Sequence, residues 1–118
     1  MKRDMDKVRG VLLALEANSG PFLMAMDTPT LGGTEDGEET VEYILTLHSA
    51  GFLESSQRSV YRLSWAGHEF LDSVRDPEIW RQTKEGAGKV GSWSMKLLGE
   101  LAVGYAKAKA VQLGLPVG

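Results

Sequence analysis

Gly86-Ala87-Gly88-Lys89-Val90-Gly91 matches the glycine pattern that binds dinucleotide cofactors. That chemistry requires a strand before the pattern, a helix opening from it and a parallel sheet around it. Here a predicted helix precedes the pattern, and the sequence predicts no parallel strands. We therefore expect a flexible hinge at residues 86–91 and no bound cofactor.

His48 and His68 are the two histidines, and each could join carboxylates such as Glu69 or Asp72 as a metal ligand or act as a base. They lie on separate predicted helices, without the spacing that places two imidazoles on one helix face. The chain also has no cysteine, no nucleophile-elbow serine and no phosphate-loop motif. We therefore expect no metal site, no catalytic residues and no enzyme activity.

A third group of residues is acidic. Five acids stand within residues 35–42, and no lysine or arginine occurs between Thr28 and Gln57. In the simplest interpretation, these acids only satisfy the dipole at the start of a helix. They would also repel DNA phosphates and attract a basic protein surface. The candidates for protein contact are Glu38, Glu39 and Glu42.

The acids begin a predicted helix that is followed by a hairpin. Apolar residues, Leu45 among them, recur at helical spacing as far as Gly51, which is expected to end the helix. Strands are then predicted over Phe52–Ser55 and Val60–Leu63, with a turn at Ser56–Ser59. This arrangement is typical of the recognition helix and wing of a winged-helix domain.

The residues before this unit predict a first helix over Asp4–Ala17, capped by Asp4, and a strand over Phe22–Met26. The core face of the first helix is expected to hold Met5, Val8, Val11, Leu12 and Leu15. Asp27–Gly37 stands where a helix-turn-helix has its second helix, but it contains one proline and three glycines. We expect a loop there, or one helical turn at most. A turn at residues 18–21 is expected to end the first helix before the strand. The second helix is therefore degenerate, and Thr34 or Asp36 caps the central helix.

After the hairpin, the sequence predicts a helix over Trp65–Arg75, with Ala66 and Phe70 facing inward. Asp76-Pro77 is expected to start a short helix, because proline is favoured at the first helical position. Ser92 or Ser94 is expected to open a last helix that ends near Leu113.

The predicted fold class is therefore an α+β winged helix with a degenerate second helix and a C-terminal helical extension. We expect residues 1–76 to form the winged-helix domain. Residues 77–118 would form the extension, packed on that domain or on a second copy. A homodimer would form through residues 93–113.

The net charge of −3 is unevenly distributed, with −5 over residues 1–50 and +2 over residues 51–118. Proteins that bind phosphate backbones are more often basic. If this protein binds DNA, the expected contacts are Arg58 and Arg62 from the wing, with Thr46 and Ser49 from the helix. Charges interrupt the most apolar late segment, residues 97–115, so we expect no membrane span. The lack of cysteine fits a reducing compartment, and we expect a cytoplasmic location.

Three segments resemble a known family: MKRDMDKVRGVLLALE, YILTLHSAGFLE, and RLSWAGHEFLDSVRDPEIW with its trailing SWSMKLLGELA. The chain resembles the uncharacterised bacterial and phage family called domain of unknown function 2513, whose members are regarded as winged-helix-like. That resemblance implies the fold and transfers no activity. Where the family often has histidine and lysine along the central helix, this chain has Tyr43 and Leu45.

Two functions remain open from the sequence. One is a phage or prophage DNA-binding transcriptional regulator. The other is a protein-interaction module whose acidic face mimics DNA or inhibits a nucleic-acid-binding or host-defence protein. The distribution of positive charge discriminates between them: DNA binding is favoured if Arg58, Arg62 and the N-terminal basic residues share one face.

Overall fold

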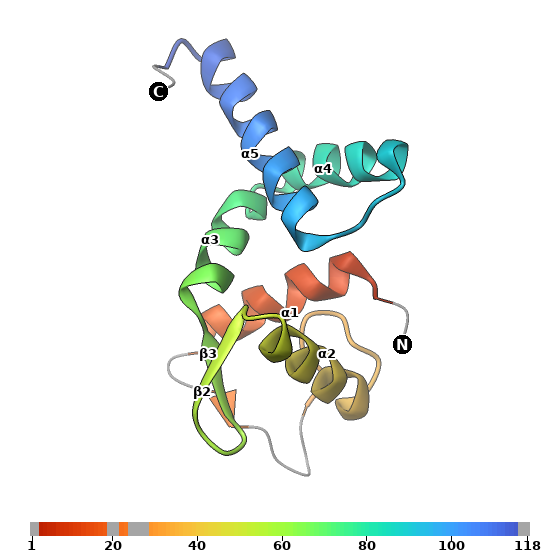
Figure 1. The fold of residues 1–118 in the computed structure, drawn as a ribbon, viewed down its shortest axis with the longest axis vertical. Helices are drawn as coiled ribbons and strands as arrows, with labels where there is room; N and C mark the ends of the chain where they lie inside the picture. The colour runs from red at the N-terminus through yellow and green to blue at the C-terminus, as the bar shows by residue number, and fades with distance from the viewer. Residues whose placement is uncertain (1–2, 19–21, 24–28, 116–118) are drawn as a thin grey trace. The chain divides into compact units, whose positions relative to one another are not determined.

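The computed structural model describes residues 3–18, 22–23 and 29–115, and these form an α+β fold (Figure 1). The elements, in chain order, are α1 (Met5–Ala17), β1 (Phe22–Leu23), α2 (Gly37–Ser49), β2 (Leu53–Gln57), β3 (Val60–Leu63), α3 (Trp65–Val74), α4 (Pro77–Val90) and α5 (Met95–Gln112). The chain divides into two compact units, residues 1–71 and 72–118. The expected division after residue 76 stays a prediction.

The first helix begins as predicted. One carboxylate oxygen of Asp4 accepts the backbone N–H groups of Asp6 at 2.9 Å and Lys7 at 3.4 Å, so Asp4 is the N-cap of α1. The predicted core face is confirmed, because five residues of α1 are buried: Met5, Val8, Val11, Leu12 and Leu15. The predicted turn that follows lies, at residues 19–21, outside the described residues.

The strands form an antiparallel sheet in the order β1-β3-β2. Residues 24–26 of the predicted first strand lie outside the part that the structure describes. β2 extends to Gln57, which pairs with Val60, so the predicted four-residue turn is wrong and the hairpin turns at Arg58–Ser59. Ser59, the second residue of this turn, has a φ of 64°, a left-handed conformation that the reversal of the chain uses here. The sequence did not predict the pairing of Gln57 with Val60, because residues 54–57 are all polar and lack the apolar alternation that marks a strand.

The loop before α2 has a defined structure. Residues 29–36 contain no helix, as predicted, whereas residues 27–28 lie outside the described part of the chain. Thr34 donates its N–H to the Leu31 carbonyl at 3.1 Å across Gly32 and Gly33, whose φ angles of 60° and 92° suit a tight turn. A Cβ on Gly10 of α1 would lie 2.3 Å from the Gly32 carbonyl oxygen. Two glycines therefore let the loop backbone pack directly on α1.

The central helix is capped by Asp36, which accepts the Glu39 N–H at 2.8 Å. At its end, Gly51 has a φ of 90° and donates to the His48 carbonyl, the pairing that a left-handed glycine makes when it ends a helix. The buried side of α2 consists of Thr40, Tyr43, Ile44 and Leu47. Leu45 is 46% exposed, because it lies outside the face that these residues define.

Two predictions for the second unit, a short helix after Asp76 and a hinge at residues 86–91, are wrong. α4 is not short and continues through Val90, so the predicted hinge at residues 86–91 is wrong. It ends at Gly91, whose φ is 79°. A Cβ on Gly86 would lie 2.5 Å from the hydroxyl of Tyr105, so glycine allows α5 to approach α4 closely.

One prediction for the first unit is also wrong. Ala66 of α3 was predicted to face inward, but it is exposed.

Ser94, and not Ser92, caps α5 by accepting the Leu97 N–H at 3.1 Å. The two helices of the second unit cross, and α5 continues beyond the crossing (Figure 1). Leu98 and Ala102 are the buried residues of α5. Across the described residues, every helix is too short or too polar to span a membrane.

Candidate functional site

The solvent side of α2 carries four exposed residues at the helical spacing i, i+4, i+7 and i+11, which places them on one face. These residues, here called the outer α2 face, are Glu38, Glu42, Leu45 and Ser49. The face combines two carboxylates with an apolar side chain. It contains no lysine or arginine.

The two polar residues predicted to contact DNA bases differ in position. Ser49 is exposed, but its hydroxyl donates to the Thr46 carbonyl at 2.8 Å. Thr46 is half-buried and lies outside the outer α2 face. Of this predicted pair, Ser49 alone is on the exposed face.

The hairpin presents its two arginines differently. Arg62 of β3 lies directly opposite Glu54 of β2, and its Nε donates to the Glu54 carboxylate at 2.7 Å. Arg58 is exposed at the turn. Ion pairing therefore offsets the charge of Arg62, which leaves Arg58 as the more accessible cation of the hairpin.

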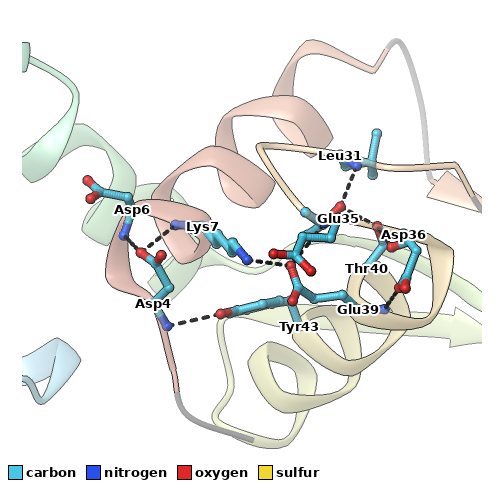
Figure 2. Close-up of polar contacts among 10 residues, drawn as sticks. Asp4, Asp6, Lys7, Leu31, Glu35, Asp36, Glu39, Thr40 and Tyr43 are labelled. Atoms are coloured by element: carbon cyan, nitrogen blue, oxygen red, sulfur yellow. Dashed lines mark hydrogen bonds and ion pairs between the residues drawn. The ribbon is translucent and has the colours of Figure 1, made fainter.

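Glu39 is not part of the outer α2 face, and its side chain joins α2 to Lys7 of α1 (Figure 2). Its Oε1 lies 2.7 Å from the Lys7 ammonium and also accepts the Glu35 N–H at 3.1 Å. The hydrogen bond from Lys7 is the main reason that the pKa of Glu39 is lowered and that of Lys7 raised. Glu39, predicted for protein contact, is thus engaged in a partly exposed ion pair with Lys7 of the same chain.

Tyr43 supports the same corner of the fold. It is 2% exposed, and its hydroxyl accepts the Asp4 N–H at 2.9 Å, so its side chain anchors the start of α1 on α2 (Figure 2). Tyr43 is therefore a core residue, whereas Leu45, two positions further on, lies on the outer α2 face.

Two buried threonine hydroxyls fix the loop before α2, and no pattern in the sequence predicted this contact. Thr34 Oγ accepts the Leu31 N–H at 2.9 Å and lies 2.6 Å from Thr40 Oγ, which donates to the Asp36 carbonyl at 3.1 Å. Because Thr40 uses its single proton on Asp36, Thr34 is the donor between the two hydroxyls. This network holds the start of the acidic helix in place.

The acids of residues 35–42 therefore have separate roles. Asp36 caps α2 and Glu39 binds Lys7, whereas Glu35, Glu38 and Glu42 are exposed. Two of the three predicted protein-contact residues, Glu38 and Glu42, stand together on the outer α2 face. In the sequence, the four-residue spacing of Glu38 and Glu42 indicates that these two acids share one face of the helix.

The two histidines make separate contacts. His48 contacts the edge of Tyr61, with ring centroids 5.2 Å apart, and His68 Nδ1 lies 3.9 Å from a Glu16 carboxylate oxygen. Among the described residues, no three histidine, cysteine or acidic side chains are grouped to hold a metal ion.

Most of the chain is similar to one protein family and to a protein of known sequence. The family described as "Hypothetical protein (DUF2513)" matches residues 2–93. A Haemophilus influenzae protein named "Uncharacterized protein" is 34% identical over 93 residues, which cover 71% of this chain and 76% of that protein. No solved structure matches the chain. The chain therefore belongs to the family described as "Hypothetical protein (DUF2513)".

Proposed function

We propose that residues 1–76 form a winged-helix domain and that the protein is a non-enzymatic regulatory adaptor that binds a basic protein partner through the outer α2 face. The order α1-β1-α2-β2-β3 supports the winged-helix assignment, with α2 in the recognition position and the β2–β3 hairpin as the wing. The loop at residues 29–36 replaces the helix that usually braces the recognition helix.

The outer α2 face carries this proposal. A recognition helix in the major groove approaches phosphates closely, and cations supply most of that attraction. Glu38 and Glu42 would face those phosphates without a neighbouring cation, so their interaction with DNA is repulsive. The same carboxylates attract lysine and arginine on a protein, and an apolar contact would cover the exposed Leu45.

The wider charge distribution supports a protein partner as well. Residues 1–71 contain 6 basic and 11 acidic side chains, a net charge of −5. Two of the basic residues, Lys7 and Arg62, already neutralise carboxylates of the same unit. The unit therefore has few cations to offer to phosphates and excess negative charge to offer to a basic surface.

A second function, DNA binding by a transcriptional regulator, is favoured by one observation. Arg58 is exposed at the tip of the hairpin, where a wing contacts the DNA backbone. In this alternative Arg58 contributes most, while Arg62 must exchange Glu54 for a phosphate.

The two functions separate in a titration of labelled random duplex DNA, followed by fluorescence anisotropy at ionic strengths from about 20 to 200 mM. We expect no saturable binding across this range. In a second arm the DNA is first bound to a small basic DNA-compacting protein, and the chain is expected to release it by occupying that protein. Direct DNA binding that weakens steeply with salt, or no release of DNA, would contradict the adaptor function.

A further inference from the structure

α5 has one face on α4 and the opposite face in solvent. Leu98 and Ala102 are 0% exposed, while Tyr105 and Lys109 reach residues of α4 and its cap. Half a turn away, six exposed residues follow one another at positions i, i+4, i+7, i+8, i+11 and i+15. This outer α5 face consists of Lys96, Glu100, Val103, Gly104, Lys107 and Val111.

The charges of the outer α5 face are complementary to themselves. Glu100 and Lys107 lie at equal sequence distances from the point midway between Val103 and Gly104. When two copies of α5 pair antiparallel about that point, each Glu100 lies opposite the Lys107 of the second copy. Parallel pairing in register would instead place Glu100 against Glu100 and Lys107 against Lys107. The pattern therefore fits a second copy in the antiparallel direction.

The centre of the outer α5 face is apolar and small. Val103 is 44% exposed, and a Cβ built on Gly104 would meet no atom within 4 Å. In the antiparallel pair, Val103 of one copy lies over Gly104 of the other, where the missing side chain allows close helix packing. Val111, which is 65% exposed, lies opposite Lys96, whose aliphatic stem can cover it.

We propose that the outer α5 face binds a second copy of this chain as an antiparallel, two-fold helix pair centred between Val103 and Gly104. Two Glu100–Lys107 contacts flank an apolar centre in this pair, and they set its direction and register. The surface is distinct from the outer α2 face, so the failure of either proposal leaves the other standing.

Cysteine cross-linking tests the pairing directly, because the natural chain has no cysteine. Val103→Cys and Val111→Cys are each treated with a short thiol–thiol cross-linker. The antiparallel pair brings residue 103 next to its own copy but separates residue 111 from its copy by about 22 Å along the helix axis. We expect a covalent dimer from Val103→Cys alone. Cross-linking at both positions would indicate a parallel pair, and cross-linking at neither would exclude the interface.

A charge exchange tests the two ionic contacts by sedimentation equilibrium of the full chain, whose monomer mass is 12.9 kDa. Glu100→Lys or Lys107→Glu alone places like charges opposite each other and should weaken dimerisation about tenfold. The double variant restores opposite charges and should recover the natural dimerisation constant. Glu69→Lys on α3 makes the same charge change as Glu100→Lys and should have no effect. A double variant as weak as either single one would overturn the proposed register.

Gly104→Leu distinguishes a lost interface from a lost fold. The position is open in the monomer, and leucine is a better helix former than glycine, so the helix content should be retained or increased. The added side chain should nevertheless prevent the close approach and leave the protein monomeric. A Gly104→Leu protein that dimerises as the natural chain does would contradict the proposed centre.

Discussion

Lys7 of α1 and Glu39 of α2 form an ion pair of 2.7 Å across 32 residues of sequence. The pair holds the start of the acidic helix against α1 and removes one of five neighbouring acids from the solvent side. Glu38 and Glu42 remain exposed on the outer α2 face. The same contact therefore both fixes α2 and determines which of its acids a partner can reach.

The Lys7–Glu39 pair makes stability depend on pH in a defined direction. The lowered pKa of Glu39 stabilises the fold above the ordinary value of 4.5, and this contribution is lost as the pH falls through the folded-state pKa. The raised pKa of Lys7 stabilises the fold below 10.5, and this contribution is lost as the pH rises through the folded-state pKa. At pH 7 both contributions are present.

Glu39→Gln should therefore lower the Tm at pH 7 by no more than about 5 °C, because the pair is partly exposed. The difference from the natural chain should shrink as the pH falls below 4.5 and vanish once the pH is below the lowered pKa of Glu39 in the folded state, because Glu39 is then protonated in both states. Thermal melts followed by circular dichroism across this pH range measure it. Glu38→Gln, which removes an exposed acid one position away, is the matched control. An equal, pH-independent loss in both variants would show that the ion pair is not the cause.

Gly10→Ala should destabilise the first unit by about 1–3 kcal/mol, because the new Cβ would meet the Gly32 backbone. The gain in helix propensity from alanine is smaller than this clash. Gly88→Ala is the control, since its Cβ has Trp93 at 3.8 Å as its nearest neighbour and room in α4. Urea denaturation should show loss for the first variant and a small gain for the second. A gain for Gly10→Ala would mean that the loop does not pack on α1 in this way.

Thr40→Val should cost about 1–3 kcal/mol, because it leaves the Thr34 hydroxyl without the acceptor that it has in the folded protein. Thr40→Ser keeps the hydroxyl and removes a methyl group, so it should cost less than valine despite the smaller volume. Both free energies come from denaturant unfolding. If serine proves as harmful as valine, packing of the methyl group, and not the hydroxyl chain, accounts for the effect.

Local signals predicted much of the fold. Asp4 as a cap, Gly51 as a helix end and Asp76-Pro77 as a helix start each act on neighbouring backbone groups, so their effect can be read from adjacent residues. The glycines of residues 86–91 misled for the opposite reason. Gly86 and Gly88 would each cost about 1 kcal/mol in an isolated helix, but Gly86 lets Tyr105 of α5 pack closely on α4, and this contact favours the helical backbone.

The candidate site was predictable in composition but not in detail. The acids and the absence of nearby cations are visible in the sequence, and so is the spacing of Glu38 and Glu42. The ion pair between Glu39 and Lys7 depends on how α1 packs against α2, which no local sequence pattern indicates. The exposure of Leu45 likewise follows from which face of α2 the rest of the core selects.

Binding of the Glu42→Lys variant to the basic DNA-compacting protein tests the adaptor function most directly, with Glu69→Lys, which makes the same charge change at an exposed position of α3, as the control. We expect about tenfold weaker binding for Glu42→Lys and the natural Kd for Glu69→Lys, because the partner contacts the outer α2 face. Equal Kd values for both variants would contradict it, since the attraction would then come from net charge and not from this face.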